Sequence, residues 1–292
     1  MEKILISAFL LFFVSPVFGQ TQVKESVPSF TDHDLKKYGT SSLGSSSSGS
    51  SSQSRESGQS DKPGNNASRS DKVTASGLKR IEIPYIGYVG TARRIIVNVK
   101  LNDSVTVPMA VDTGAPGMVI STAVAEKLNI LTKDEGKLIT QSSGIGGSTP
   151  SIFTIIESVQ VGDLRDEFIP TQIIDKEFPG FQGLIGMDFM ANYKVNIDTE
   201  KGVLVFEEQP SGYKRPGGHD EAWWRTNFRQ FAAMKNSLQA LREKLSKQQT
   251  DMPYEKKIKD FVESQYLEAE KLFNRLDSYA IRHSVPMHWR SY

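Results

Sequence analysis

The amino-acid sequence predicts a mainly β domain, a compact β barrel or sandwich, followed by an α-helical hairpin. Short segments of alternating apolar and polar residues, separated by glycine-rich turns, fill about 130 residues in the middle of the chain. After Pro216 the apolar residues recur at steps of three and four, as they do on one face of an amphipathic helix. Before residue 77, a serine- and glycine-rich tract lacks the apolar residues that a folded core requires.

The composition excludes several classes of function. The chain has 292 residues, a formal net charge of +1 and 24% charged residues, so we expect no nucleic-acid partner. It contains no cysteine, which removes disulfides, thiol catalysis and cysteine-based zinc sites. The four histidines are scattered without a metal-binding spacing, so we expect no metal and no cofactor. They are His33, His219, His283 and His288.

The first residues are typical of an export signal. Lys3 precedes an apolar run over residues 4–14, which is too short to span a membrane comfortably. Pro16 breaks this run and Gly19 offers a small residue to a signal peptidase, so we predict a signal peptide over residues 1–19. An uncleaved N-terminal anchor is the alternative. After cleavage we expect no stable membrane span and a periplasmic or secreted protein.

Residues 20–76 are predicted to form a disordered linker. Serine and glycine dominate residues 41–60, and residues 61–70 continue polar. Such a composition buries too little apolar area to offset the entropy of ordering the chain.

Strand patterns begin near Leu78, and the predicted β domain spans residues 77–209. Two alternating segments, residues 95–101 and 105–111, are joined by a turn at Asn102. Ser121 is a candidate N-cap for a short helix that ends at Leu128. Further strands are predicted over residues 137–141, 153–161, 168–174, 193–198 and 203–207.

The predicted helical hairpin spans residues 218–285. Its first helix carries the apolar stripe Trp224, Phe228, Phe231, Met234, Leu238, Leu241 and Leu245. Its second helix, with Asp251 as cap, carries Ile258, Val262, Tyr266, Ala269, Leu272, Leu276 and Tyr279. Such stripes more often serve core or dimer packing, including coiled coils, than a peptide groove.

The residues that could carry chemistry stand in the run Asp112-Thr113-Gly114-Ala115, directly after an apolar strand. A carboxylate placed there costs more to ionise, and the glycine lets the backbone turn tightly behind it. Such a tripeptide is also found as a plain turn between strands. Two further features favour a site: a glycine-rich hairpin tip over residues 142–149 and the step Leu184-Ile185-Gly186 into a short helix.

With these features in this order, residues 78–208 resemble the retropepsin-like aspartic proteases, and in pattern the single-copy, exported bacterial members. The resemblance implies the closed β barrel of acid proteases and an aspartic-type endopeptidase activity. It also implies that Asp112 is the catalytic residue. The loop-supporting residues would be Thr113, Gly114, Ala115, Ile185 and Gly186. The flap that covers the substrate would be Gly144, Ile145, Gly146 and Gly147.

Aspartic proteolysis needs two carboxylates that share a proton, and the sequence holds one Asp-Thr-Gly run and no Asp-Ser-Gly. We therefore expect a homodimer through the protease domain, with a two-fold axis between the two copies of Asp112. The ionised carboxyl would take a proton from a water, which attacks the carbonyl of an extended peptide or protein substrate. The protonated carboxyl would donate to the developing oxyanion.

Pro116 departs from the family pattern, in which a polar residue follows the alanine. Proline lacks the N–H that in related enzymes bonds to the peptide, so a non-catalytic peptide-binding or scaffolding module with the same fold is the alternative. Asp188 is a second candidate acid, although its place before a helix favours a charge role at the helix N-terminus. Asp198 is expected to be a hairpin residue.

Overall fold

The computed structural model describes residues 72–73, 79–89, 93–132, 137–144, 147–208, 215–247 and 253–292. The predicted signal peptide lies outside the described residues, as does the predicted linker apart from Lys72 and Val73. Ile145 and Gly146 of the predicted flap, and Asp251 before the second helix, also lie outside them. All described residues belong to one compact unit.

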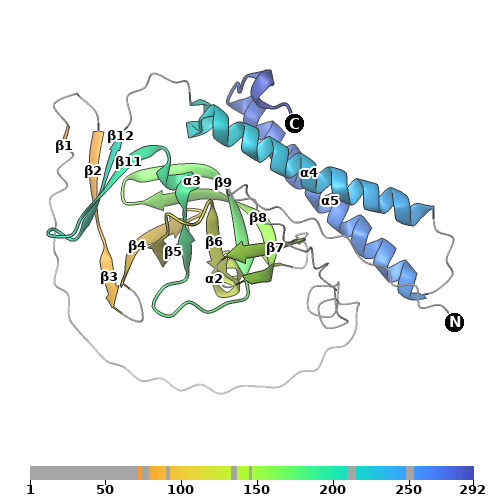
Figure 1. Ribbon diagram of the computed structural model, residues 1–292, viewed down its shortest axis with the longest axis horizontal. Helices are drawn as coiled ribbons and strands as arrows, with labels where there is room; N and C mark the ends of the chain where they lie inside the picture. The colour runs from red at the N-terminus through yellow and green to blue at the C-terminus, as the bar shows by residue number, and fades with distance from the viewer. Residues whose placement is uncertain are drawn as a thin grey trace, which may run out of the picture. The chain divides into compact units, whose positions relative to one another are not determined.

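The described strands form two sheets (Figure 1). The four-stranded sheet has the order β1-β2-β12-β11, with bounds Lys72–Val73, Lys79–Pro84, Val203–Glu208 and Tyr193–Asp198. The eight-stranded sheet has the order β3-β4-β5-β10-β6-β9-β8-β7. In that order its strands are Ile86–Val89, Arg93–Leu101, Val105–Val111, Gly183–Ile185, Met118–Ser121, Leu164–Ile174, Gly147–Val161 and Leu138–Gly144. β1 differs from the prediction, because its two residues pair with β2 although they lie in the predicted linker.

The eight-stranded sheet curves around the barrel core. β4 pairs with β8 as well as with β5, with Val99 opposite Val161, so that β4, β5, β10, β6, β9 and β8 form a ring. The buried residues of β4 and β5 alternate as the sequence predicts for half-buried strands. They include Val97, Val99, Leu101, Val107 and Met109. The predicted fold class, mainly β with a C-terminal helical region, is confirmed.

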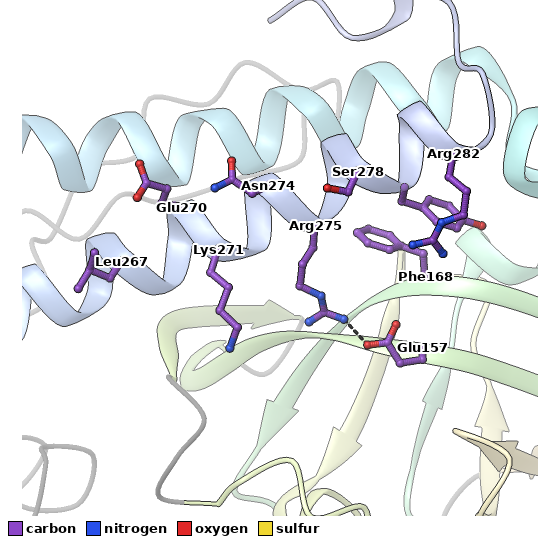
Figure 2. Close-up of a pocket in the computed structure, with 10 residues that line it drawn as sticks. Glu157, Phe168, Leu267, Glu270, Lys271, Asn274, Arg275, Ser278 and Arg282 are labelled. Carbon is purple, nitrogen blue, oxygen red and sulfur yellow. Dashed lines mark hydrogen bonds and ion pairs between the residues drawn. The ribbon is translucent and has the colours of Figure 1, made fainter.

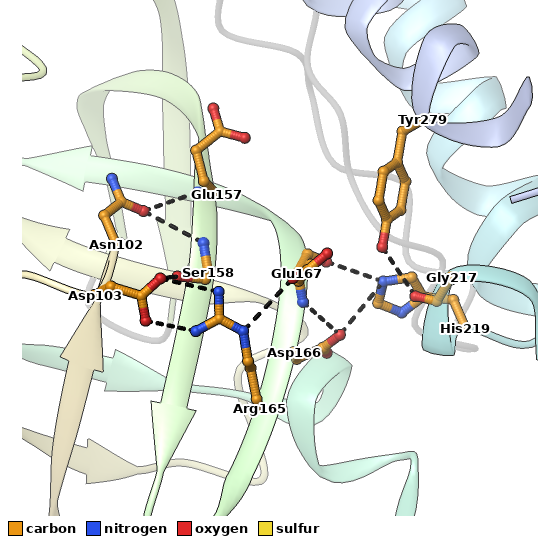
Figure 3. Close-up of polar contacts among 10 residues, drawn as sticks. All are labelled: Asn102, Asp103, Glu157, Ser158, Arg165, Asp166, Glu167, Gly217, His219 and Tyr279. Atoms are coloured by element: carbon orange, nitrogen blue, oxygen red, sulfur yellow. Dashed lines mark hydrogen bonds and ion pairs between the residues drawn. The ribbon is translucent and has the colours of Figure 1, made fainter. Parts of the chain in front are cut away.

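The turn between β4 and β5 is fixed by side chains. Asn102 and Asp103 adopt left-handed φ angles of 47° and 55°, which asparagine and aspartate tolerate better than most residues. The Oδ1 atom of Asn102 accepts hydrogen bonds from the N–H groups of Glu157 (2.9 Å) and Ser158 (3.3 Å). The Arg165 guanidinium donates to both Asp103 oxygens, at 2.5 and 2.9 Å (Figure 3). The predicted turn is thereby joined to the β8–β9 hairpin.

β8 and β9 extend further than the alternation of the sequence predicts. β8 begins at Gly147 rather than at residue 153, because it pairs with the whole of β7. β9 begins at Leu164 rather than at residue 168, and the two strands meet at Val161 and Leu164. Phe168 interrupts the alternation with a φ of 58°, and its ring stacks on Tyr279 at a centroid distance of 4.7 Å.

Four α-helices are described, together with two short 3-10 helices, within the residue ranges given above. Their bounds are α2 Thr122–Lys127, α3 Met187–Met190, α4 Glu221–Ser246, α5 Pro253–Arg282, η1 Pro216–Gly218 and η2 Met287–Trp289. The predicted cap of α2 is observed, since Ser121 Oγ accepts from the Val124 N–H at 3.4 Å. Asp220 is the N-cap of α4, since its carboxylate accepts from the Trp223 N–H at 2.8 Å. No helix of the described part is long and apolar enough to cross a membrane.

α4 and α5 lie side by side as an antiparallel hairpin (Figure 1). Trp224, Phe228 and Phe231 of α4, and Leu272 and Leu276 of α5, are at most 1% exposed. These side chains share one core with residues of the eight-stranded sheet: Leu138, Phe153, Ile155 and Phe168. Part of each apolar stripe of the helical hairpin therefore serves a core that is shared with the sheet.

Candidate active site

Asp112 lies at the end of β5, where the chain enters the loop that leads to β6. β10 lies between β5 and β6 in the sheet and pairs with both strands. Ile185 is opposite Val111 in the parallel pairing with β5, and Leu184 is opposite Val119 in the antiparallel pairing with β6. The Asp112 N–H donates to the Ile185 carbonyl at 3.0 Å. β10 thus supports the start of the loop that carries the predicted catalytic residue.

The turn from β10 into α3 holds the rest of this loop through the main chain. The Met187 N–H donates to the Ala115 carbonyl at 2.9 Å, and the Asp188 N–H donates to the Pro116 carbonyl at 2.8 Å. Gly186 permits this approach, because a Cβ atom at that position would lie 2.5 Å from the Ala115 oxygen. Glycine is the residue that fits where two backbones meet so closely.

The loop presents its carboxylate at the surface of the chain. Oδ1 of Asp112 accepts a hydrogen bond from the Gly114 N–H at 2.9 Å, and the Asp112 carbonyl accepts from the Ala115 N–H at 3.2 Å. Asp112 and Ala115 are half-buried, whereas Thr113, Gly114 and Pro116 are exposed. The loop is therefore held by its main chain, while its outer side remains open to solvent.

The hairpin predicted as the flap consists of β7 and β8. Gly144 is opposite Gly147 at its end, and the two residues between them lie outside the described part. The Ser143 and Ser148 hydroxyls share a hydrogen bond of 2.8 Å across the two strands. Within the part that the structure describes, no hydrogen bond joins this hairpin to the Asp112 loop.

Asp188 lies closer to the predicted active-site loop than its sequence position suggests. A Cβ atom built at Gly117 would lie 3.4 Å from Oδ2 of Asp188. Burial, with a smaller effect of the Asp220 charge, raises the pKa of Asp188 to about 6. Asp198 lies instead in the β11–β12 hairpin, where Oδ1 accepts from the Lys201 N–H at 2.9 Å.

A second group of buried polar side chains lies between β9 and α4 (Figure 3). His219 Nε2 lies 3.2 Å from the Glu167 carbonyl and 3.6 Å from Oδ1 of Asp166. Because a carbonyl only accepts, Nε2 carries the proton. Nδ1 is buried and has no hydrogen-bond partner among the described residues. The ring stacks on Trp223 at a centroid distance of 3.6 Å.

The surroundings keep this pair of side chains uncharged over a range of pH. Burial raises the pKa of Asp166 to about 7, against a hydrogen bond from the Glu167 N–H, and the nearby Asp188 charge adds to the rise. Burial lowers the pKa of His219 to about 4, although the hydrogen bond to Glu167 opposes this change. Between these two values the carboxyl and the imidazole are both neutral, so the contact is a neutral pair rather than an ion pair.

One groove of about 500 Å³ lies between α5 and the sheet (Figure 2). Its lining includes Glu157, Phe168, Lys271, Arg275 and Arg282, and none of the residues predicted for catalysis. An ion pair between Arg275 and Glu157 links the helix to β8. Among the described residues, no group of three or more histidine, aspartate or glutamate side chains is placed to hold a metal ion.

Three buried polar residues were not predicted as functional from the sequence: Gln265, Asp166 and His219. Gln265 lies within the apolar stripe of α5, between Val262 and Ala269, and it is 6% exposed. A polar residue inside an apolar stripe is the signal that could have identified it, because a buried amide requires partners. For Asp166 and His219, no pattern in the sequence relates the two positions.

Residues 97–189 match the family model described as aspartyl protease, and this span runs from β4 into α3. Over this segment, which is less than half of the chain, the sequence is similar to the aspartyl proteases, in agreement with the resemblance described above. Membership of a single-copy, exported bacterial group stays a prediction.

Individual relatives match parts of the chain. Protein DDI1 homolog 2 from Homo sapiens is 28% identical over 116 residues, which cover 40% of this chain and 28% of that protein. A solved retropepsin-like aspartic protease from Rickettsia conorii is 18% identical with a TM-score of 0.32, covering 45% of this chain and 91% of that one. EIAV protease complexed with the inhibitor HBY-793 is 20% identical with a TM-score of 0.28. The match covers 36% of this chain and 91% of that one.

Proposed function

We propose that this protein is an aspartic endopeptidase in which the Asp112 carboxyls of two identical chains act on one water. The observation that carries this proposal is the Asp112 loop itself. Its main chain is held on both sides by β10 and by the start of α3, while Thr113 and Gly114 are exposed. A rigid loop that presents a carboxylate at an open surface suits a site that a second chain completes.

The dimer follows from the number of carboxylates that the chemistry needs. The sequence has one Asp-Thr-Gly run, and aspartic proteolysis uses two carboxyls that share a proton. A two-fold axis beside Asp112 would bring the second carboxyl to the first. Much of the apolar stripes of α4 and α5 is packed in a core within the chain, so we place the dimer contact on the protease domain.

The two carboxyls would divide the work of catalysis. Like charges a few ångströms apart do not both ionise readily, so one carboxyl keeps its proton at mildly acidic pH. The ionised carboxyl takes a proton from the water, whose oxygen attacks the peptide carbonyl carbon. The protonated carboxyl donates its proton to the carbonyl oxygen. As the C–N bond breaks, the proton taken from the water passes to the leaving amine, and a hydroxyl of the tetrahedral intermediate returns a proton to the second carboxyl. The β7–β8 hairpin would cover an extended peptide bound as an added strand.

Peptide cleavage by the full-length chain and by Asp112→Asn tests this proposal. We expect the wild-type chain to cleave members of a quenched-fluorescence peptide pool between pH 4 and pH 7, and the variant to lose this activity by a factor of about 1,000 or more. Asp260→Asn, which changes an exposed acid on α5, serves as the matched control and should cleave like the wild type. Equal activity of Asp112→Asn and the wild type would reject the proposal.

Pro116 favours one other function, that of a peptide-binding module without catalysis. A proline in the loop offers no N–H to a bound peptide, although its carbonyl accepts from Asp188. Binding of the same peptide pool, measured by fluorescence anisotropy without any cleavage, would support this alternative. Cleavage that depends on Asp112 would exclude it.

We also propose that residues 1–19 direct export, followed by a linker over residues 20–76, and that the protein acts in the periplasm or outside the cell. The apolar run before Pro16 supports this proposal. N-terminal sequencing of the protein recovered from expressing cells tests it. A first residue of Gln20 is expected, and an intact Met1 would indicate an uncleaved anchor or no export.

A further inference from the structure

The edge strand of the barrel sheet is bound by a side chain of α5. β7 is the last strand of the eight-stranded sheet, so within the described part of the chain no strand neighbours the outward N–H and C=O groups of its main chain. Gln265 fills this place: its Oε1 accepts from the Ile139 N–H at 2.7 Å, and its Nε2 donates to the Lys137 carbonyl at 2.8 Å. The carboxamide thus makes the two hydrogen bonds that the main chain of another strand would make.

The same end of the hairpin is packed against both helices. Leu138 of β7 is opposite Phe153 of β8, and these two side chains are 2% and 3% exposed. The Phe153 ring meets Phe231 of α4 edge to face, with a centroid distance of 5.2 Å. Gln265 is itself 6% exposed, so its hydrogen bonds lie in an environment from which water is largely excluded.

These contacts are confined to one end of the hairpin. Ile139 lies five positions before Gly144, where β7 ends, and the strand continues from the bonded residues to that end. Ser143, Gly144, Gly147 and Ser148 at the other end are exposed. The helices therefore hold the base of the β7–β8 hairpin and leave its far end free of them. Because the base of the hairpin is fixed, the direction in which its exposed end points is also defined.

We propose that α5 orients the β7–β8 hairpin over the peptide-binding site, and that Gln265 is the positioning residue through which it does so. This role in turnover rests on the function proposed above, whereas the attachment of the hairpin to α5 does not. The family match ends at residue 189, so the helix that provides Gln265 lies outside the matched segment. The C-terminal helices would thus set the hairpin geometry from outside the protease barrel.

Three variants of the full-length chain test the inference. Gln265→Met removes both hydrogen bonds at similar volume, and Gln265→Glu keeps the acceptor for the Ile139 N–H but loses the donor to Lys137. Arg275→Gln is the matched control, because it removes another contact between α5 and the sheet, the ion pair to Glu157 (Figure 2). Glu157 lies towards the other end of β8, ten positions after Gly147.

Amide hydrogen exchange without any ligand gives the first measurement. In Gln265→Met, the Ile139 amide and the other amides of residues 138–144 should exchange at least about tenfold faster than in the wild type, as loss of two buried hydrogen bonds implies. The acceleration should be smaller in Gln265→Glu and absent from this segment in Arg275→Gln. Unchanged exchange in residues 138–144, or an equal acceleration of all strands, would overturn the inference.

Steady-state cleavage of one peptide from the pool gives the second measurement. A misdirected hairpin weakens peptide binding, so KM should rise about three- to tenfold in Gln265→Met while kcat changes less than about twofold. A merely structural loss lowers the folded fraction and would reduce kcat at constant KM, which would contradict the positioning role. If the wild type cleaves no peptide, the proposed function fails, and the exchange measurement still decides whether Gln265 holds the hairpin.

Discussion

At the scale of single residues, the candidate site depends on close contacts between two stretches of main chain. Gly186 lies against the Asp112 loop so closely that a Cβ atom there would be 2.3 Å from the Gly117 oxygen and 2.5 Å from the Ala115 oxygen. Any other residue must push the loop away from β10. The position of the Asp112 carboxylate therefore depends on a residue that has no side chain.

Replacement of Gly186 by alanine should displace the loop. We expect Gly186→Ala to lower the free energy of unfolding by about 1–3 kcal/mol, the usual cost of forcing extra volume into a packed site. Cleavage should fall at least about tenfold, because the carboxylate moves. Gly87→Ala is the control, since a Cβ atom there would have no atom of a described residue within 4 Å. Thermal melting and peptide cleavage measure both effects, and equal behaviour of the two variants would contradict the expectation.

The buried pair between β9 and α4 gives the protein a specific dependence on pH. Asp166 has a pKa raised to about 7, so the folded state keeps a proton that the unfolded state loses near its usual value of 3.8. Its contribution to stability is complete below that usual value and is lost as the pH rises through about 7. His219 acts in the opposite direction, because its pKa is lowered to about 4 and its contribution is lost as the pH falls from 6.5 through 4.

Asp166→Asn separates the two effects. The variant removes the carboxyl and keeps the imidazole, so its stability relative to the wild type should increase as the pH rises from 4 to about 7 and then remain level. The gain should approach about 4 kcal/mol at most, as a pKa change from 3.8 to about 7 implies. Denaturant unfolding at several pH values measures it. A difference between variant and wild type that does not vary with pH would show that Asp166 is ionised when folded.

At the scale of elements, the helical hairpin and the barrel sheet complete each other's cores. Phe231 of α4 contacts Phe153 of β8 at 5.2 Å and Phe168 of β9 at 6.4 Å, measured between ring centroids. Phe168 reaches this core because its backbone is left-handed, with a φ of 58°. The apolar face of the helices thus covers apolar side chains of β8 and β9.

Truncation of Phe231 should therefore destabilise more than one element. We expect Phe231→Ala to lower the free energy of unfolding by about 3–5 kcal/mol, as large-to-small changes of buried aromatic residues do. Leu267→Ala, at a position that is 52% exposed on α5, should change it by less than about 0.5 kcal/mol. Denaturant unfolding, followed through both helical and strand circular dichroism signals, measures the changes. A loss confined to the helical signal would contradict a shared core.

At the scale of the whole molecule, the β barrel and the C-terminal helices form one structural unit. The barrel supplies Leu138, Phe153, Ile155 and Phe168 to the joint core, and Gln265 binds the edge strand β7. Removal of the helices would expose these apolar side chains and leave the outward groups of β7 without Gln265. A contiguous exposed apolar patch of this kind favours aggregation.

Deletion of residues 218–292 should accordingly abolish the stable barrel. We expect the shortened chain to aggregate or to lose its cooperative melting transition, because the outer face of β8 and β9 loses its cover. A chain without residues 20–71, which make up most of the predicted linker, is the control and should melt like the full-length protein. A soluble chain ending at residue 217 with the wild-type melting temperature would show that the barrel folds independently of the helices.

Much of the fold and part of the candidate site follow from local patterns in the sequence. The apolar alternation of residues 95–101 and 105–111 predicts β4 and β5, and Asn102 predicts the turn between them. The stripe that begins at Trp224 predicts α4. These predictions succeed because each pattern reflects the period of one element and the residues that end it. The predicted association of the Asp112 loop with Leu184, Ile185 and Gly186 instead came from the family resemblance.

The sequence by itself determined most of the strands and helices, although not the short strands β3, β6 and β10. It also determined where the candidate carboxylate stands in the chain. Tertiary structure decided what the helices cover: Gln265 meets Ile139 across 126 positions, and His219 meets Asp166 although no periodicity links them. Periodicity reports which face of an element is buried, but it does not identify the element that buries it. That choice depends on the shape and hydrogen-bonding needs of both surfaces, here the uncovered face of β8 and β9 and the unpaired edge of β7.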